Sequence, residues 1–373
     1  MSADGRKIVT RKEWEKIRRP EILELLTQQM YGIMPSEPFH TSYRILEESE
    51  KALGGKATRK QIEITFRKKE REHKVIMLLY LPNAVKDKAP VFFVYNFWGN
   101  QVICKDPAII PTSERENGCR TNRWPVPMII DSGYGIATID YTWIYPDNRE
   151  AKTSGRHKSV LTLFSDKNEA GLDGNECQAI GAWAWGMSRA MDYFEKDRDI
   201  DASRVIIMGH SRLGKTALWA GAQDKRFSIV ISNESGCGGA KLSKRDFGQT
   251  VLSVTTNFPH WFCKNFSRYA DREQELPFDQ HFVISMIAPR PVYVASAAED
   301  LWSDPQGEFL AAMHAGEVYR LYGFKGLETE ICPAAGHPIM NRVGYHIRNG
   351  KHDVTEEDWK NYIRFADLWS GKQ

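Results

Sequence analysis

Five short runs of Val, Ile and Phe constrain the fold of this chain more than any other feature. They cover residues 90–95, 135–139, 204–208, 228–232 and 291–297. Near-continuous apolar runs of this length are typical of parallel strands buried on both faces. Helical patterns separate them, notably at 179–194 and 213–223. The alternation predicts an α/β fold, a three-layer αβα sandwich around a doubly wound, mostly parallel sheet.

The first eighty residues follow different patterns. Apolar side chains recur at three- and four-residue steps over 10–31, which predicts a helix that Pro20 should break into two pieces. Apolar and polar residues alternate over 42–82, most clearly at 61–67 and less so at 74–81. This alternation predicts antiparallel strands at an edge of the sheet.

The chain contains no internal repeat, low-complexity tract or linker, so we expect a single domain over residues 1–373. Residues 1–35 would form a helical segment packed on that domain. Residues 242–282 interrupt the alternation with aromatic side chains. An insertion after the carboxyl end of a strand is placed to shape a substrate cleft, and extra helical packing explains the pattern equally well.

Composition excludes several classes of protein. The 51 Lys and Arg nearly balance the 48 Asp and Glu, giving a net charge of +3, which disfavours a nucleic-acid partner. No run of 18 apolar residues occurs, so no spanning helix and no membrane partner are expected. The six cysteines lack metal-ligand spacing, which disfavours a metal site but leaves disulfides open.

A strand that runs into a tight turn and a helix carries the strongest functional signal. Residues 204–215 read Arg-Val-Ile-Ile-Met-Gly-His-Ser-Arg-Leu-Gly-Lys. This is the context of a nucleophile elbow, which would hold Ser211 above the sheet, beside a base and backbone N–H groups. The motif departs from Gly-x-Ser-x-Gly because Leu213 stands at the second glycine position and Gly214 follows it. A phosphate-binding loop is the alternative, although no Walker spacing surrounds Lys215.

A serine nucleophile needs an acid and a histidine base, in the chain order Ser, acid, His for this fold. Glu234 and Asp300 each follow an apolar strand. Six of the ten histidines lie downstream of Glu234: His260, His281, His314, His337, His346 and His352. The residues alone leave the base open, with His337 and His352 both in polar loops near the end of the chain.

A second oxyanion donor is expected after the strand at residues 90–95. Residues 97–100 read Phe-Trp-Gly-Asn at that position. Hydrolases with a nucleophile elbow place a backbone N–H there. A simple turn is an equally good interpretation of the same four residues.

Eight segments together resemble the bacterial glucuronoyl esterases of carbohydrate esterase family 15. They span nearly the whole chain: Trp14 with 18–23, then 96–100, 182–186, 209–215, 232–240, 258–263, 288–296 and 346–353. No single segment is specific, but the combination is. The resemblance implies an α/β-hydrolase fold and a serine esterase that uses no metal and no organic cofactor.

The resemblance also implies roles for individual residues. Ser211 matches the nucleophile of the family, and His352, in Gly-Lys-His-Asp, matches its base. The family has two positions for the acid and both are filled here; we expect Glu234 to be the principal acid and Asp300 to share or support its role. Arg212 matches an arginine whose backbone N–H and side chain stabilise the oxyanion.

Three further positions are expected to bind substrate. Lys215 matches a residue that hydrogen-bonds the sugar, and Trp302 matches the tryptophan that lies against the glucuronate ring. Gln249 stands where many bacterial relatives have Glu in a Gly-Glu-Thr segment, which predicts an altered sugar contact. His337 then becomes a structural loop residue, and His260 and His281 become cleft or core residues.

A disulfide beside the active site of the fungal members is missing here. Its two cysteine positions hold His210 and Asp353. We therefore expect that Cys237 and Cys263 could pair instead, which would suit an oxidising compartment.

The sequence thus predicts a serine esterase that cleaves the ester between 4-O-methyl-glucuronate of glucuronoxylan and lignin alcohols. Acetylxylan esterase or another carbohydrate esterase activity on the same residues is the alternative. A non-catalytic glycan-binding relative and a peptidase are weaker ones. We expect a monomer that is secreted or periplasmic, because its polymeric substrate cannot enter a cell. Residues 1–10 lack an apolar signal region, so a signal peptide would have been removed.

Overall fold

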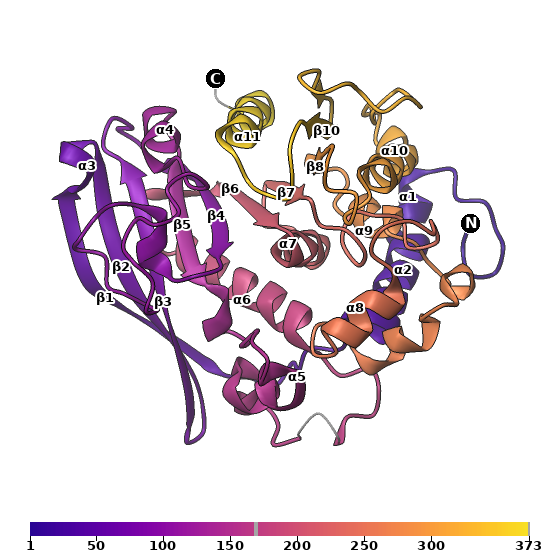
Figure 1. Cartoon of the computed structure of the whole chain (residues 1–373), viewed down its shortest axis with the longest axis horizontal. Helices are drawn as coiled ribbons and strands as arrows, with labels where there is room; N and C mark the ends of the chain where they lie inside the picture. Colours follow the sequence, from indigo (N-terminus) through magenta and orange to yellow (C-terminus); the bar gives the residue numbers. More distant parts are fainter. Residues whose placement is uncertain (168–170, 372–373) are drawn as a thin grey trace.

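The computed structural model describes residues 1–167 and 171–371, which form one ten-stranded sheet (Figure 1). The spatial order of the strands is β1-β2-β3-β5-β4-β6-β7-β8-β10-β9. Their bounds are β1 His40–Lys51, β2 Ala57–Lys68, β3 Arg71–Pro82, β4 Ala89–Asn96, β5 Gly135–Asp140, β6 Ile200–His210, β7 Ile229–Asn233, β8 Val292–Ala297, β9 Ile339–Met340 and β10 Val343–Arg348.

The two halves of the sheet differ in strand direction, as predicted. Strands β5, β4, β6, β7, β8 and β10 pair in parallel, while β1, β2 and β3 form an antiparallel edge that joins the sheet through β5. Strand β10 was not predicted, because its sequence Val-Gly-Tyr-His-Ile-Arg lacks a continuous apolar run. The mostly parallel, doubly wound sheet expected from the sequence is confirmed.

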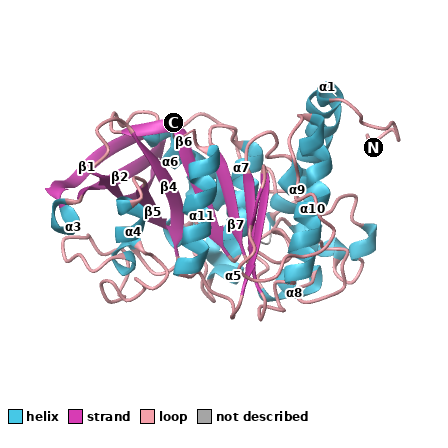
Figure 2. Cartoon of the chain, turned by 90° about the horizontal axis from the view of Figure 1, so that it is seen from above, coloured by secondary structure: helices cyan, strands magenta, loops and turns pink. Residues whose placement is uncertain are grey.

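Helices cover both faces of this sheet (Figure 2). Their bounds are α1 Arg11–Glu13, α2 Arg19–Leu26, α3 Ala52–Gly55, α4 Val126–Asp131, α5 Ala151–Ser154, α6 Ala179–Phe194, α7 Arg212–Gln223, α8 Val251–Asn257, α9 His281–Ser285, α10 Pro305–Leu321 and α11 Glu356–Trp369. Helices α4 and α11 pack on one face, and α6, α7 and α10 pack on the other. These are the three layers that the alternation of strands and helices predicts.

Each central strand contributes alternate residues to two separate cores. In β4, Phe92 and Val94 belong to the core under α4 and α11, whereas Val91 and Phe93 belong to the core under α6 and α7. All of these side chains are at most 3% exposed. A strand buried on both faces needs an apolar residue at every position, which is why these strands read as continuous runs.

The amino-terminal segment corrects one expectation, because Pro20 does not break the helix. The backbone stays helical from Arg11 to Tyr31, with π turns at Trp14–Arg18 and Thr27–Tyr31. In the first π turn the Arg19 N–H donates to the Trp14 carbonyl. This wider turn directly precedes Pro20 and accommodates a residue that has no N–H to donate.

Candidate active site

The predicted site residues meet at one edge of the sheet. Ser211 follows β6, Glu234 follows β7, Asp300 lies three residues after β8, and His352 lies four residues after β10. These four strands are parallel, so their carboxyl ends lie at the same edge. Open α/β sheets place their ligand sites at that edge.

The turn at Ser211 has the geometry of a nucleophile elbow. Ser211 has φ 58° and ψ −127°, a strained combination for a residue with a side chain. A Cβ on Gly209 would lie 1.9 Å from the carbonyl oxygen of Leu213, and one on Gly214 would lie 3.0 Å from the carbonyl oxygen of Gly209. Glycine is therefore required at 209, where a Cβ would overlap backbone, and a Cβ at 214 would also crowd the Ser235 side chain at 2.9 Å, whereas Leu213 fits the position between them.

His352 lies over His210, the residue that precedes Ser211. Its ring centroid is 4.4 Å from that of His210, and the Nδ1–H of His210 donates to Oδ1 of Asn233 at 2.5 Å. Burial holds the pKa of His210 well below its usual value, so this ring is neutral. The Ser211 hydroxyl has no hydrogen-bond partner among residues 1–167 and 171–371. Catalytic hydrogen bonds are often long without substrate and tighten in the complex.

Two carboxylates share the Nδ1–H of His352 unequally. Oδ2 of Asp300 lies 2.6 Å from Nδ1, and Oε2 of Glu234 lies 3.2 Å from it. Burial alone would lower the pKa of His352, but the hydrogen bonds to Asp300 and Glu234 raise it to about 9. These distances favour Asp300 as the main acceptor, contrary to the expectation that Glu234 is the principal acid.

Glu234 has further partners that Asp300 does not have. Its Oε1 accepts from the Arg348 guanidinium at 2.6 Å, and its Oε2 accepts from the Asp353 N–H at 3.0 Å. Glu234 is 1% exposed, and burial raises its pKa to about 7. One ligand atom from each of Glu234, Asp300 and His352 lies within 4.8 Å of the others, as a metal site would require. The guanidinium of Arg348 already pairs with Glu234, which fits a proton-relay site better than a cation site.

On the other side of Ser211, Arg212 is held by a residue that the sequence did not single out. Its guanidinium donates to Oδ2 of Asp147 and lies 4.7 Å from the centre of the Trp261 ring. Asp147 also accepts from Nε2 of His260 at 2.7 Å, from Nε1 of Trp261 at 2.9 Å and from the Tyr141 hydroxyl at 2.8 Å. His260 and Trp261 come from the predicted cleft-shaping insertion. Asp147 could have been suspected because it follows the carboxyl end of β5.

The charge of Asp147 is permanent. Burial would raise its pKa, but the hydrogen bond from His260 and the charge of Arg212 hold that pKa far below the ordinary value. The side chain of Asp147 is 2% exposed and that of Arg212 is 26% exposed. The buried Asp147 carboxylate thus fixes the Arg212 guanidinium, which is partly exposed at the site.

The three predicted substrate-binding residues lie in different environments. Lys215 is buried and donates to the carbonyl oxygens of Ser235 and Cys237 and to Oε1 of Gln249 at 3.0 Å, which uses its three N–H groups. Burial lowers its pKa to about 8. Gln249 is buried as well, whereas Trp302 is 52% exposed beside Asp300. In this structure Lys215 and Gln249 therefore contact each other, and only Trp302 is an open surface.

Residues 97–99 form a bend that leads into a 3₁₀ helix at Asn100–Ile103. The N–H groups of Trp98 and Gly99 both donate to Oδ1 of Asn96, at 3.2 and 2.7 Å. Neither group is therefore available to an oxyanion, and that expectation is wrong for these two residues. The N–H of Arg212, which as the first residue of α7 has no intrahelical acceptor, is a main-chain candidate directly beside Ser211.

The proposed pairing of Cys237 and Cys263 is also wrong. Both are buried free thiols. Cys237 faces the hydroxyl of Ser243 and Cys263 faces the carbonyl oxygen of Gln28, each at 3.9 Å. The segments of Cys237 and Cys263 both pack against the amino-terminal helices, but their thiols have different partners.

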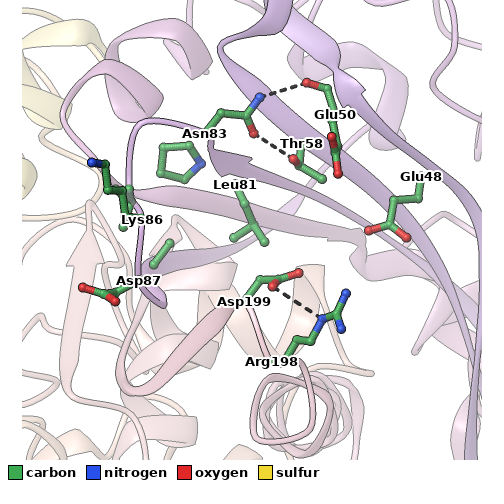
Figure 3. A pocket seen from close by; sticks show the side chains of 12 residues that line it. Glu48, Glu50, Thr58, Leu81, Asn83, Lys86, Asp87, Arg198 and Asp199 are labelled. Carbon is green, nitrogen blue, oxygen red and sulfur yellow. Dashed lines mark hydrogen bonds and ion pairs between the residues drawn. The ribbon is translucent and has the colours of Figure 1, made fainter.

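A hollow of about 480 Å³ lies at the opposite edge of the sheet (Figure 3). It is lined by residues at the amino ends of β4 and β6, including Ala89 and Asp199, and by the antiparallel edge strands. Asn83 is one of its lining residues and donates to the Glu50 carbonyl at 2.8 Å and accepts from Thr58 at 2.7 Å (Figure 3). The hollow lies at the amino ends of the strands, whereas Ser211 follows the carboxyl end of β6, so the two are at opposite edges of the sheet.

Comparison with known proteins identifies the family. A family model described as glucuronyl esterase of fungi matches residues 107–323. The structure of a glucuronoyl esterase from Solibacter usitatus is 44% identical, with a TM-score of 0.93 over 99% of this chain and 96% of that one. A promiscuous esterase of carbohydrate esterase family 15 from the marine bacterial metagenome is 43% identical, with a TM-score of 0.91 over 99% and 95% of the two chains.

A more distant relative comes from a fungus. The 4-O-methyl-glucuronoyl methylesterase 1 of Phanerochaete chrysosporium is 32% identical over 60% of this chain and 47% of its own length. Both of the solved structures match along almost the entire chain. The resemblance noted in the sequence is therefore confirmed, and the chain belongs to the glucuronoyl esterases of carbohydrate esterase family 15.

Proposed function

We propose that this protein hydrolyses the ester between 4-O-methyl-glucuronate side chains of xylan and lignin alcohols, with Ser211 as nucleophile. The observation that carries the proposal is the hydrogen bond of 2.6 Å between His352 Nδ1 and Asp300, beside the strained turn at Ser211. A histidine held by a carboxylate next to an elbow serine is the arrangement needed for acyl transfer.

The reaction follows from the roles of these three residues. The hydroxyl of Ser211 attacks the ester carbonyl while Nε2 of His352 accepts its proton. The same proton passes to the alcohol as it leaves, and a glucuronoyl ester of Ser211 remains. Water, activated by His352, then attacks this ester and releases the glucuronate. Asp300 holds the imidazole in position and stabilises the imidazolium, whose pKa of about 9 reflects that support.

Arg212 is the proposed oxyanion stabiliser. Its backbone N–H starts α7 beside Ser211, and its guanidinium is fixed by Asp147 and Trp261. A donor that is oriented before the reaction stabilises developing charge without reorganisation. A fixed cation next to the carbonyl also favours the carboxylate product, because the uncleaved ester carries no charge there.

The sugar side of the site rests on Trp302, Lys215 and Gln249. The half-exposed ring of Trp302 offers a flat apolar face to a sugar. Lys215 and Gln249 support that side through their mutual hydrogen bond, and a sugar hydroxyl that replaced one of their present partners would bind them directly. The fungal relative is a methylesterase of 4-O-methyl-glucuronate by name, which supports the acyl group that we propose.

The alternative is a broader carbohydrate esterase that also removes acetyl groups. One relative of 43% identity is named a promiscuous esterase, so this alternative is tested in the same experiment. Hydrolysis of benzyl glucuronate, 4-nitrophenyl acetate and acetylated xylan would be compared for the wild type and Ser211→Ala. We expect the glucuronate ester to be the best substrate and all activity to be lost in the variant. Preference for the acetates would contradict the proposed substrate, and retained activity would contradict the nucleophile.

We also propose a monomer that acts outside the cytoplasm, where its polymeric substrate occurs. No helix within residues 1–167 and 171–371 combines the length and the apolar character needed to cross a bilayer. Light scattering on the purified protein would test the monomer. Fractionation of the native host would test the compartment, and a protein confined to the cytoplasm would contradict the proposed substrate.

A further inference from the structure

One buried arginine, Arg348 at the end of β10, lies under the loop that carries His352. Its side chain is 3% exposed. Nη2 donates to the carbonyl oxygens of Lys351 and Asp353, at 3.0 and 2.7 Å, and Nη1 donates to the carbonyl oxygen of Asn349 at 3.0 Å. Lys351 and Asp353 are the immediate neighbours of His352, so Arg348 holds the backbone on both sides of the catalytic base.

The same guanidinium also joins two buried carboxylates. Nη2 lies 2.6 Å from Oε1 of Glu234, and Nε donates to Oδ2 of Asp358 at 2.9 Å. Asp358 accepts in addition from Nε2 of His346 at 2.9 Å and from the N–H of Thr355 at 2.7 Å, at the start of α11. Arg348 is therefore anchored to a helix and to a strand, and it uses the planar fork that distinguishes arginine from lysine.

This arrangement separates the two acids next to His352. Glu234 gives one oxygen to Arg348 and the other to the Asp353 N–H. Asp300 has no arginine or lysine partner within the described residues, and His352 is its cation. A carboxylate already neutralised by a guanidinium attracts an imidazolium less strongly than one that is not. The proton on Nδ1 of His352 is thus directed to Asp300.

We propose that Arg348 is a positioning residue, which fixes the loop of His352 and engages Glu234 so that His352 donates to Asp300. The proposal rests on the proposed function only in taking His352 as the base. It assigns Glu234 a supporting position and explains why His352 Nδ1 lies closer to Asp300 than to Glu234.

The test is Arg348→Lys, which keeps the positive charge but loses the planar guanidinium with its several N–H donors. We expect kcat per active site to fall about 100-fold, because a displacement of about 1 Å in a catalytic group costs about that much. KM should stay within about twofold, since no substrate contact is removed. The downfield proton resonance of His352 Nδ1, assigned by its loss in Asp300→Asn, should shift or broaden. Active sites are counted with a fluorophosphonate.

The matched control is Arg290→Lys. Arg290 is half-buried and, like Arg348, donates to backbone carbonyl oxygens, those of Gly221, Asp224 and Phe227, but it lies beneath the end of α7 and far from His352 in the fold. We expect it to lose thermal stability and keep its kcat. A wild-type kcat in Arg348→Lys, or an unchanged His352 resonance despite a low kcat, would overturn the proposal.

Two further measurements test the role of Arg348 if Arg348→Lys does not fold or if the proposed substrate is wrong. If Arg348→Lys does not fold by circular dichroism, Asp358→Asn releases one anchor of Arg348 and should lower kcat about tenfold by the same displacement; a wild-type kcat in that variant would overturn the proposal. The rate of fluorophosphonate labelling of Ser211 reports on His352 without any glucuronate ester. A wild type that labels quickly but ignores glucuronate esters would therefore contradict the proposed substrate and leave this test intact.

Discussion

On each side of Ser211 a cation lies beside buried carboxylate groups. The two sides differ in the pKa values of these groups. On one side Asp147 is ionised at all relevant pH values, and it fixes Arg212 with the help of His260 and Trp261. On the other side, burial raises the pKa of Glu234 to about 7 and the acids raise that of His352 to about 9. One side holds a permanent charge in place and the other holds groups that exchange protons.

The difference follows from the number of donors that each carboxylate receives. Asp147 accepts four hydrogen bonds, one from a guanidinium, which compensates for its burial. Glu234 accepts from Arg348, from one backbone N–H and, at 3.2 Å, from His352, and it is 1% exposed. A hydrolase needs both kinds of site, because an oxyanion requires a fixed positive field while the nucleophile requires a base that can change its charge.

The largest expected effect separates the two acids on the proton-exchanging side. Asp300→Asn should lower kcat about 10⁴-fold, because the amide no longer stabilises the imidazolium that forms on His352. Glu234→Gln should lower it about tenfold, since Arg348 and the loop of His352 remain in place. Steady-state kinetics on benzyl glucuronate would check both variants. A larger loss in Glu234→Gln would show that the shorter hydrogen bond does not identify the working acid.

A smaller effect is expected on the side of permanent charge. Asp147→Asn should lower kcat about 100-fold, which is the usual cost of disturbing one oxyanion donor. The side chain of Arg212 would lose its anionic partner and turn away from the site. Asp224→Asn is the matched control, because Asp224 also pairs with an arginine, Arg226, but away from Ser211. Equal kinetics for the two variants would mean that Arg212 does not need Asp147.

The smallest expected effect is a shift in pH dependence. His352 must be unprotonated to accept the proton of Ser211, so kcat/KM should rise with pH toward an inflection near 9. The acids stabilise the protonated ring, so their removal lowers its pKa, and Asp300→Asn should move the inflection to lower pH. Asp147→Asn should leave it in place. If the inflection moved in Asp147→Asn as well as in Asp300→Asn, the two sides of Ser211 would not differ in their effect on the pKa of His352.

The same comparison shows how far sequence reasoning reaches. Ser211 was predicted because the strand, the turn glycines and the helix that define an elbow are neighbours in the sequence. Asp147 was missed because its partner Arg212 is 65 residues away and no local pattern marks the pair. The ranking of Glu234 over Asp300 came from family resemblance, and the distances that disfavour it depend on where four strands end.

The remaining errors have a similar origin. Pro20 was expected to break a helix because the rule assumes a regular α-helix, whereas the chain uses a π turn before it. The pairing of Cys237 and Cys263 was suggested because the cysteine positions of the fungal disulfide hold His210 and Asp353, but whether two thiols meet is set by tertiary packing. The parallel strands were predicted correctly because a strand that is buried on both faces has a continuous run of apolar residues in its sequence.

Covalent labelling of Ser211 tests the proposed chemistry most directly. The protein would be treated with a fluorophosphonate, mapped by peptide mass spectrometry and assayed in parallel on benzyl glucuronate. We expect one phosphonyl group, on Ser211, and loss of hydrolysis in proportion to labelling, with labelling much slower in Asp300→Asn. Label on another residue, or full hydrolysis of the glucuronate ester by labelled protein, would contradict the assignment of Ser211, His352 and Asp300 as the catalytic residues.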